Sequence, residues 1–189
     1  MVVSKLTQDT KNNLVTMLKG TDDVLTALRG AVKNQVVGVL KDVTDIATAG
    51  MDSISDVVEG AVDSAGDIGE SVTNVIKSSV SAAINGVSEL GGNAMSAAKN
   101  AASGAIAGVA NIGEDLGEAA VSVVEGAIEA AGKLGASTAD AAKEATLGAI
   151  EAADKVSSEA GSKVRDALMS AASLPHDIID AVIKGSDKK

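Results

Sequence analysis

Few side chains in this sequence have types and spacings that could carry out chemistry. Its one histidine, His176, precedes Asp177, and an imidazole beside a carboxylate can act as a general base. The chain has no Cys, and no serine lies in a nucleophile-elbow sequence, so we interpret His176 as a polar residue at the start of a helix. The pattern predicts that the protein is not an enzyme.

Acidic residues occur in two adjacent pairs that could bind a cation, Asp22-Asp23 and Glu114-Asp115. Neither pair lies in a calcium-binding loop, which has about 12 residues with oxygen ligands at alternate positions. The phosphate-binding patterns G-x-G-x-x-G and G-x-x-x-x-G-K-[ST] are also absent. We therefore expect no metal and no cofactor, and we interpret the acidic pairs as part of a solvated face.

The amino-acid composition excludes further functional classes. The 189 residues include no Phe, Trp or Tyr, and 16 Lys plus Arg against 26 Asp plus Glu give a net charge of −10. Such a chain has no aromatic rings to stack on bases and repels phosphate, so we expect no nucleic-acid partner. Its hydrophobic content of 46%, all Ala, Val, Ile, Leu and Met, is too high for a disordered protein.

The elements that position these residues are set by a repeat of 22 residues that begins at Lys33. Successive units start KNQVVGVL, SDVVEGAV, KSSVSAAI, KNAASGAI, VSVVEGAI, KEATLGAI and RDALMSAA. Two columns of this alignment are aliphatic in nearly every unit. We predict that they form an apolar interaction face, with Val62, Ile84, Ile106, Ile128 and Ile150 at the eighth position and Ile68, Leu90, Ile112, Leu134 and Val156 at the fourteenth.

Each unit consists of two halves of 11 residues, and 11 residues make about three turns of α-helix. The apolar positions of a half then fall on one arc of about 130°, as on an amphipathic helix. No segment has the alternation of a strand. The sequence predicts an all-α protein of long amphipathic helices, arranged either as one extended helix or as helical hairpins in a bundle.

The exceptions to the repeat divide the chain into three segments. These are an N-terminal amphipathic helix in 1–20, the repeat region in 21–174, and a short C-terminal helix with a tail in 175–189. We expect Gly20 to end the first helix and Thr21-Asp22 to start the next. Gly91-Gly92-Asn93 is the best internal turn, and Pro175 breaks the helix because proline lacks an amide donor.

Glycine falls in two registers of the repeat. One register holds Gly38, Gly60, Gly104, Gly126 and Gly148, and the other holds Gly69, Gly91, Gly113 and Gly135. A glycine within a helix costs roughly 1 kcal/mol relative to Ala, so nine cost about 9 kcal/mol, and a lone helix would not persist in water. Small residues four apart let a second helix approach closely. We predict close helix packing at Gly69, Gly91, Gly104, Gly108, Gly113, Gly117 and Gly135.

The repeats resemble a known class of sequences. Eleven-residue amphipathic repeats rich in Ala, Val and Gly, such as EGAIEAAGK at 125–133, are similar to those of perilipins, synucleins, exchangeable apolipoproteins and late-embryogenesis-abundant proteins. The similarity covers residues 22–173. It implies helices that form on a lipid surface, or that bundle when the protein is dry or concentrated.

We therefore expect a non-enzymatic coat protein whose repeated helices bind a lipid or other apolar surface. The alternative is a structural protein that assembles with copies of itself into bundles, sheaths or filaments through Gly- and Ala-lined helix packing. A protectant that folds on water loss is less favoured, because the mean hydropathy is +0.22. The chain shows no signal peptide and no transmembrane span, so we expect it to be intracellular, soluble or peripherally surface-bound.

Overall fold

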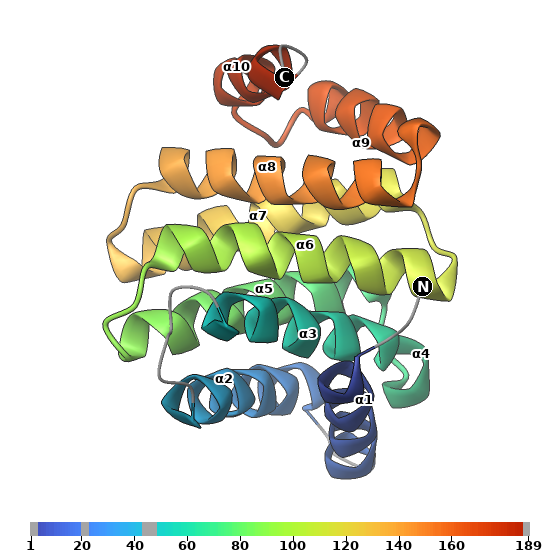
Figure 1. Ribbon diagram of the computed structural model, residues 1–189, viewed down its shortest axis with the longest axis vertical. Coiled ribbons are helices and arrows are strands. Elements are labelled where there is room, and N and C mark those ends of the chain that lie inside the picture. The colour runs from blue at the N-terminus through green and yellow to red at the C-terminus, as the bar shows by residue number, and fades with distance from the viewer. Residues whose placement is uncertain (1–3, 20–22, 43–48, 187–189) are drawn as a thin grey trace.

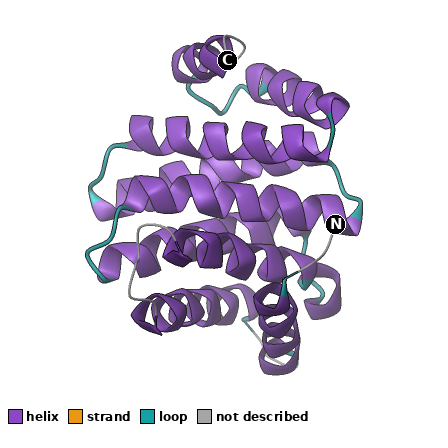
Figure 2. Cartoon of the chain, in the orientation of Figure 1, coloured by secondary structure: helices purple, strands orange, loops and turns teal. Residues whose placement is uncertain are grey.

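The computed structural model describes residues 4–19, 23–42 and 49–186. These residues form ten helices and no strand, which confirms the predicted all-α class. Figure 2 colours the chain by secondary structure. The chain reverses between its long helices, so it adopts the bundle and not the single extended helix (Figure 1). The helices are α1 (Lys5–Leu18), α2 (Val24–Asp42), α3 (Ala49–Asp63), α4 (Ala65–Ile68), α5 (Val72–Glu89), α6 (Ala94–Ile112), α7 (Leu116–Leu134), α8 (Thr138–Val156), α9 (Ser158–Ser170) and α10 (His176–Ser186).

The helices pack in two layers. One layer contains α1, α3, α6 and α8, and the other contains α2, α5, α7 and α9 (Figure 1). Consecutive long helices alternate between the layers, so α6 packs between α3 and α8, and α7 packs between α5 and α9. The one-turn helix α4 belongs to the connection between α3 and α5. Because each connection reverses the chain, α3, α6 and α8 run parallel to one another.

A glycine and a capping residue define four successive turns of the array. Four glycines end successive helices with φ of 76°, 72°, 74° and 67°, at Gly69, Gly91, Gly113 and Gly135. Two residues later, a polar side chain accepts a backbone N–H of the next helix, at Ser71, Asn93, Asp115 and Ser137. One period of the sequence repeat is therefore one helix plus one turn.

The prediction of close helix packing is wrong for Gly69, Gly91, Gly113 and Gly135. A Cβ atom built on any of them meets no atom within 4 Å, so no neighbouring helix requires their small size. They are glycine because L side chains avoid the left-handed region of the backbone. Because they lie in turns, these four glycines do not lower the stability of a helix. The free-energy cost of about 1 kcal/mol per glycine applies only to the register that contains Gly104, where the glycines lie inside helices. The turn at Gly91-Gly92-Asn93 is present, and three similar turns accompany it.

Close helix packing does occur at Gly104, Gly108 and Gly117. A Cβ atom on Gly104 would overlap the backbone carbonyl oxygen of Ser55 in α3. On Gly108 it would lie 2.9 Å from a side-chain carbon of α3, and on Gly117 it would lie 2.9 Å from one of α9. These glycines let helices of one layer approach until backbone meets backbone.

The contact made by Gly104 repeats along both layers. Gly126 of α7 lies against the backbone of Lys77 in α5, and Gly148 of α8 lies against the backbone of Lys99 in α6. In each case the glycine follows its contact by 49 positions, the same separation as at Gly104. The glycine register that contains these residues therefore joins helices two steps apart along the chain.

The predicted apolar face lies mostly inside the molecule. The eighth-position column is in the core, with Val62, Ile84, Ile106 and Ile150 at most 1% exposed and Ile128 partly buried. The fourteenth-position column lies at or near helix C-termini. It runs from 9% exposed at Ile68 and partly buried at Leu90 to 37–39% exposed at Ile112, Leu134 and Val156. The stripe thus packs helices of one chain against each other.

Capping residues and a proline mark the helix starts near the two described ends of the chain. Ser4 caps α1, and Asp23 caps the start of α2 by accepting the N–H of Thr26 at 3.1 Å. The expected boundary residues at 20–22 lie outside the described residues. At the other end, Pro175 immediately precedes α10, which starts at His176.

Replacement of Gly104 by Ala is expected to destabilise the protein, and replacement of Gly38 by Ala is expected to stabilise it. The first change forces α3 and α6 apart, at a cost of about 1–3 kcal/mol. Gly38 lies inside α2 with open space at its Cβ position, so Ala gains up to about 1 kcal/mol of helix propensity. Urea unfolding followed by circular dichroism measures both changes. Equal effects at the two positions would contradict this account of the packing.

Candidate functional site

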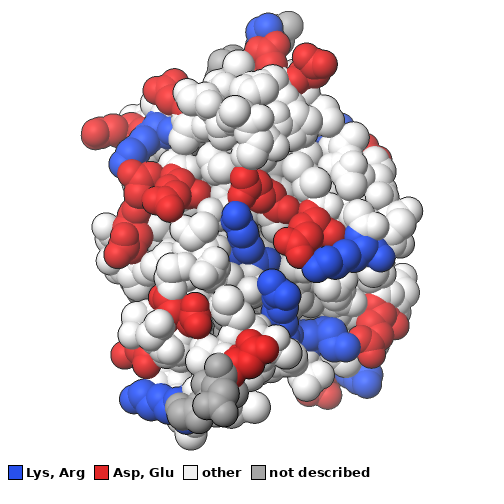
Figure 3. Space-filling view, turned by 180° about the vertical axis from the view of Figure 1, so that it is seen from behind, with Lys and Arg blue, Asp and Glu red and all other residues white. Residues whose placement is uncertain are grey.

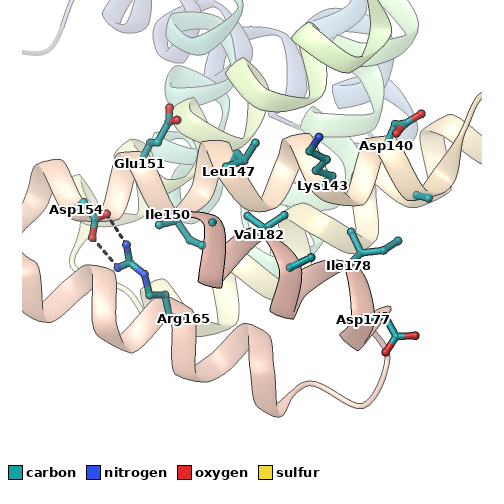
Figure 4. Close-up of a pocket in the computed structure, with 13 residues that line it drawn as sticks. Asp140, Lys143, Leu147, Ile150, Glu151, Asp154, Arg165, Asp177, Ile178 and Val182 are labelled. Atoms are coloured by element: carbon teal, nitrogen blue, oxygen red, sulfur yellow. Dashed lines mark hydrogen bonds and ion pairs between the residues drawn. The ribbon is translucent and has the colours of Figure 1, made fainter. Parts of the chain in front are cut away.

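A groove of about 770 Å³ lies between α8 and α10 (Figure 4). This volume is within the range of about 300–1,000 Å³ usual for ligand sites. Aliphatic side chains from both helices line it, chiefly Leu147, Ile150, Ile178 and Val182. Charged side chains also line it, namely Asp140, Lys143, Glu151 and Asp154 of α8, Arg165 of α9 and Asp177 of α10.

The groove forms because the layer of α3, α6 and α8 is incomplete at its C-terminal end. Inside the array, α8 packs extensively on α6, which has the same length of 19 residues. The next helix to pack on α8 is α10, which has only 11 residues. It therefore covers α8 less completely than a full repeat would, so Leu147 of α8 and Ile178 of α10 remain partly exposed between the two helices, while Ile150 and Val182 beneath them are buried.

Arg165 fixes one end of the groove by joining α9 to α8. Its Nη1 and Nη2 donate to the two carboxylate oxygens of Asp154, each at 2.8 Å, as the dashed lines in Figure 4 show. This geometry is the bidentate pairing at which Arg is most effective. Hydrogen bonding to Arg165 and its positive charge lower the pKa of Asp154, against a smaller opposing effect of burial.

Lys143 occupies the repeat position of Lys99, 44 residues earlier, but has a different environment. The Nζ of Lys99 reaches across from α6 to both carboxylate oxygens of Glu151, at 2.9 Å each. Lys143 is exposed and makes no ion pair with any described residue, because α8 has no full-length helix packed on this side. Figure 4 shows Asp140, Lys143, Leu147 and Glu151 projecting from the same side of α8.

A second hollow, of about 530 Å³, is acidic and lies beside the turns after α3 and α6. Its carboxylates are Asp63, Asp67, Glu70, Glu114 and Glu118. Asp67 pairs with Lys11 at 3.3 Å, and Glu118 accepts a hydrogen bond from Thr73 at 3.0 Å. Asp63 is only 9% exposed, and its Oδ1 has no hydrogen-bond partner. Burial raises the pKa of Asp63, and the nearby positive charge of Lys11 opposes that effect.

The described residues among those singled out for chemistry serve as helix caps or lie at the surface, and Asp22 lies outside the described residues. Asp115 caps α7 and pairs with Lys163 at 2.7 Å, and these contacts lower its pKa. His176 is the exposed first residue of α10. Across the residues that the structure describes, no group of three or more His, Asp or Glu could hold a metal ion. No described helix is both long enough and apolar enough to cross a membrane.

Ion pairs connect successive helices of one layer, and charges of both signs are interspersed over the rear face (Figure 3). Lys33 of α2 pairs with Glu89 of α5 at 2.8 Å, and Lys77 of α5 pairs with Glu125 of α7 at 2.6 Å. Together with the Lys99 pair, these contacts place a lysine near the same repeat position opposite a glutamate two helices further on. They join parallel helices of one layer at the surface.

The structure brings only one residue of the predicted apolar face, Ile150, into the groove. The sequence analysis missed Leu147, although a signal for it exists in the fifth column of the repeat. That column is polar in four successive earlier units, at Glu59, Ser81, Ser103 and Glu125. The change from a polar residue to Leu147 occurs in α8, the helix that is covered by the short α10 instead of a full-length helix. Ile178 and Val182 fall after Pro175, where the repeat pattern no longer assigns a face.

Comparison with known proteins adds a likeness to a solved structure. No family model and no curated protein matches the chain. A crystal structure of the de novo designed helical repeat protein DHR7 aligns with 79% of this chain and 94% of its own, at 18% identity and a TM-score of 0.34. The two-layer all-α architecture described above rests on the contacts within this chain.

Replacement of Asp154 by Asn is expected to destabilise the protein at pH 7 by up to about 1 kcal/mol, since the pair is partly exposed. A carboxylate whose pKa is lowered by folding stabilises the protein above its unfolded value of about 3.9. That contribution is lost as the pH falls through the lower folded value. Urea unfolding at pH 7 and about pH 2 should therefore show a larger difference at pH 7 than at pH 2. Glu144→Gln on the same helix, which has no ion pair with a described residue, is the control.

Replacement of Asp63 by Asn is expected to stabilise the protein at neutral pH. Its raised pKa means that the folded state disfavours the charged form, so the carboxylate is destabilising above its folded pKa. The gain should shrink as the pH falls toward about 3.9, below which the unfolded chain is protonated too. Thermal unfolding across this range measures the effect. Asp67→Asn, which removes the pair with Lys11, should give no such gain.

Proposed function

We propose that this chain is a non-enzymatic structural protein that associates with copies of itself. The observation that carries the proposal is the groove between α8 and α10, which is lined by the partly exposed aliphatic side chains of Leu147 and Ile178. A helix layer that ends with uncovered apolar side chains favours a further helical partner. The absence of a metal cluster among the described residues is compatible with this role but is not the reason for it.

The distribution of the apolar stripe supports self-association over coating of a surface. The eighth-position column, from Val62 to Ile150, is already covered by other helices of the same chain. Binding of the whole stripe to a lipid surface would require these helices to separate first. A partner that docks at the groove requires no such change, because Leu147 and Ile178 are accessible in the folded chain.

A surface-active coat remains the second candidate, and one observation favours it. The exposed aliphatic residues Ile112, Leu134 and Val156 are 37–39% exposed at the ends of α6, α7 and α8. Consecutive helices run in opposite directions, so these residues lie alternately at the two edges of the array. They would provide first contacts with an apolar surface before the helices open at the glycine turns.

Sedimentation velocity over a range of concentrations, combined with circular dichroism, tests the proposal. We expect a helical protein without lipid, and a sedimentation coefficient that rises with concentration. Concentration must be set from peptide-bond absorbance because the chain has no aromatic residue. A helical monomer at every concentration would contradict self-association. Helix formation only with neutral lipid vesicles, and flotation with them, would favour the coat instead.

Two matched variants distinguish the groove from the turn edges as the surface that binds a partner. Leu147→Ser removes an aliphatic side chain from the groove, and Leu134→Ser removes one from a turn edge. Self-association through the groove predicts weaker association for the first variant only. Coating predicts weaker flotation for the second variant and no effect on the oligomeric state of either.

A further inference from the structure

The outer side of α8 carries charges in an arrangement that is symmetrical about Leu147. Lys143 lies four residues before Leu147, and Glu151 lies four residues after it. Asp140 and Asp154 lie seven residues before and after. Residues spaced by three and four positions share one face of a helix. All five residues line the groove, and the aliphatic side chain lies at the centre of the pattern.

We infer that two copies of the chain pair through this face, with the two α8 helices antiparallel and a twofold axis at Leu147. This inference rests on the proposed function, for which it names the partner surface. Antiparallel pairing centred on Leu147 places Lys143 opposite the partner's Glu151, and the reverse contact follows from the symmetry. A parallel arrangement in register would instead place like charges opposite each other. The charge pattern therefore selects the antiparallel arrangement.

The groups at this face are able to make the contacts that the pairing requires. Lys143 has no ion pair with any described residue, so its ammonium group is available. Glu151 is already bound by Lys99, but a carboxylate has about four acceptor sites and can accept a further donor. Asp140 would face the partner's Asp154, whose charge Arg165 of the same copy already compensates at 2.8 Å.

The same kind of contact joins successive helices within the chain. Lys77 pairs with Glu125 and Lys99 pairs with Glu151, each between helices two steps apart. Lys143 occupies the next equivalent position, but the short helix α10 provides no ion-pair partner for it among the described residues. Pairing of two copies would supply that helix from outside and bury Leu147 against its symmetry mate. Because both copies use the same surface, the contact closes at a dimer and does not by itself extend into a filament.

Charge reversal in two separate variants tests this arrangement. In Lys143→Glu, two carboxylates face each other at each site of the homodimer, and in Glu151→Lys two ammonium groups do. Each variant alone should dimerise at least about tenfold more weakly than the wild type. In an equimolar mixture, every facing pair of a heterodimer is again of opposite charge, so the dimer should return. Sedimentation velocity measures the three samples, and circular dichroism verifies that each variant is folded.

Lys155→Glu is the matched control, because it makes the same charge change on α8 outside the groove lining. It should change the dimer dissociation constant by no more than about twofold. A wild-type dimer that both reversals leave intact, or that the mixture does not restore, would overturn this interface and leave the proposed self-association standing. A wild type that is monomeric at every concentration would overturn both. A monomer that floats with lipid vesicles would instead make a lipid the occupant.

Discussion

The fold depends on the close approach of helices two steps apart along the chain. Gly104 and Gly148 each lie directly against a backbone carbonyl of the preceding helix in their layer, where any side chain would overlap it. These contacts join α3 to α6 and α6 to α8, so the helix between each pair in sequence packs in the other layer. The stability of the array then comes from many small side chains in dense contact, which is why a chain without aromatic residues can have a closed core.

The glycine contacts fix how far parallel helices slide along each other, because Gly104, Gly126 and Gly148 each lie against a residue 49 positions earlier. Electrostatic contacts complement this packing over a range of offsets, since Lys33, Lys77 and Lys99 reach glutamates 56, 48 and 52 positions further on. At the groove between α8 and α10 these contacts are not repeated. Leu147 is only partly covered there, and Lys143 has no ion pair with a described residue.

Much of the fold could be predicted from the sequence, and so could the turn at Gly91-Gly92-Asn93, but the equivalent turns at Gly69, Gly113 and Gly135 could not. Periodicity identified the helices, and the core column from Val62 to Ile150, because burial on one face repeats with the helical period. The role of Gly113 was missed because one helix plus one turn is 22 residues long, so the spacing of apolar residues continues across the turn as it would along an uninterrupted helix. Only the capping residue two positions later, Asp115, distinguishes a turn from a close contact. The groove was not predicted because it depends on the shortness of α10, a property of the end of the array and not of the repeat.

The equality between one sequence period and one helix plus its turn limits how the length of the chain can change. A duplication of 44 residues, which is two periods, would add one helix to each layer and leave the C-terminal groove on the same side of the molecule. A duplication of a single period would move every later helix to the opposite layer and reverse its direction. Unequal recombination between repeats would therefore preserve the groove and its orientation only in even steps.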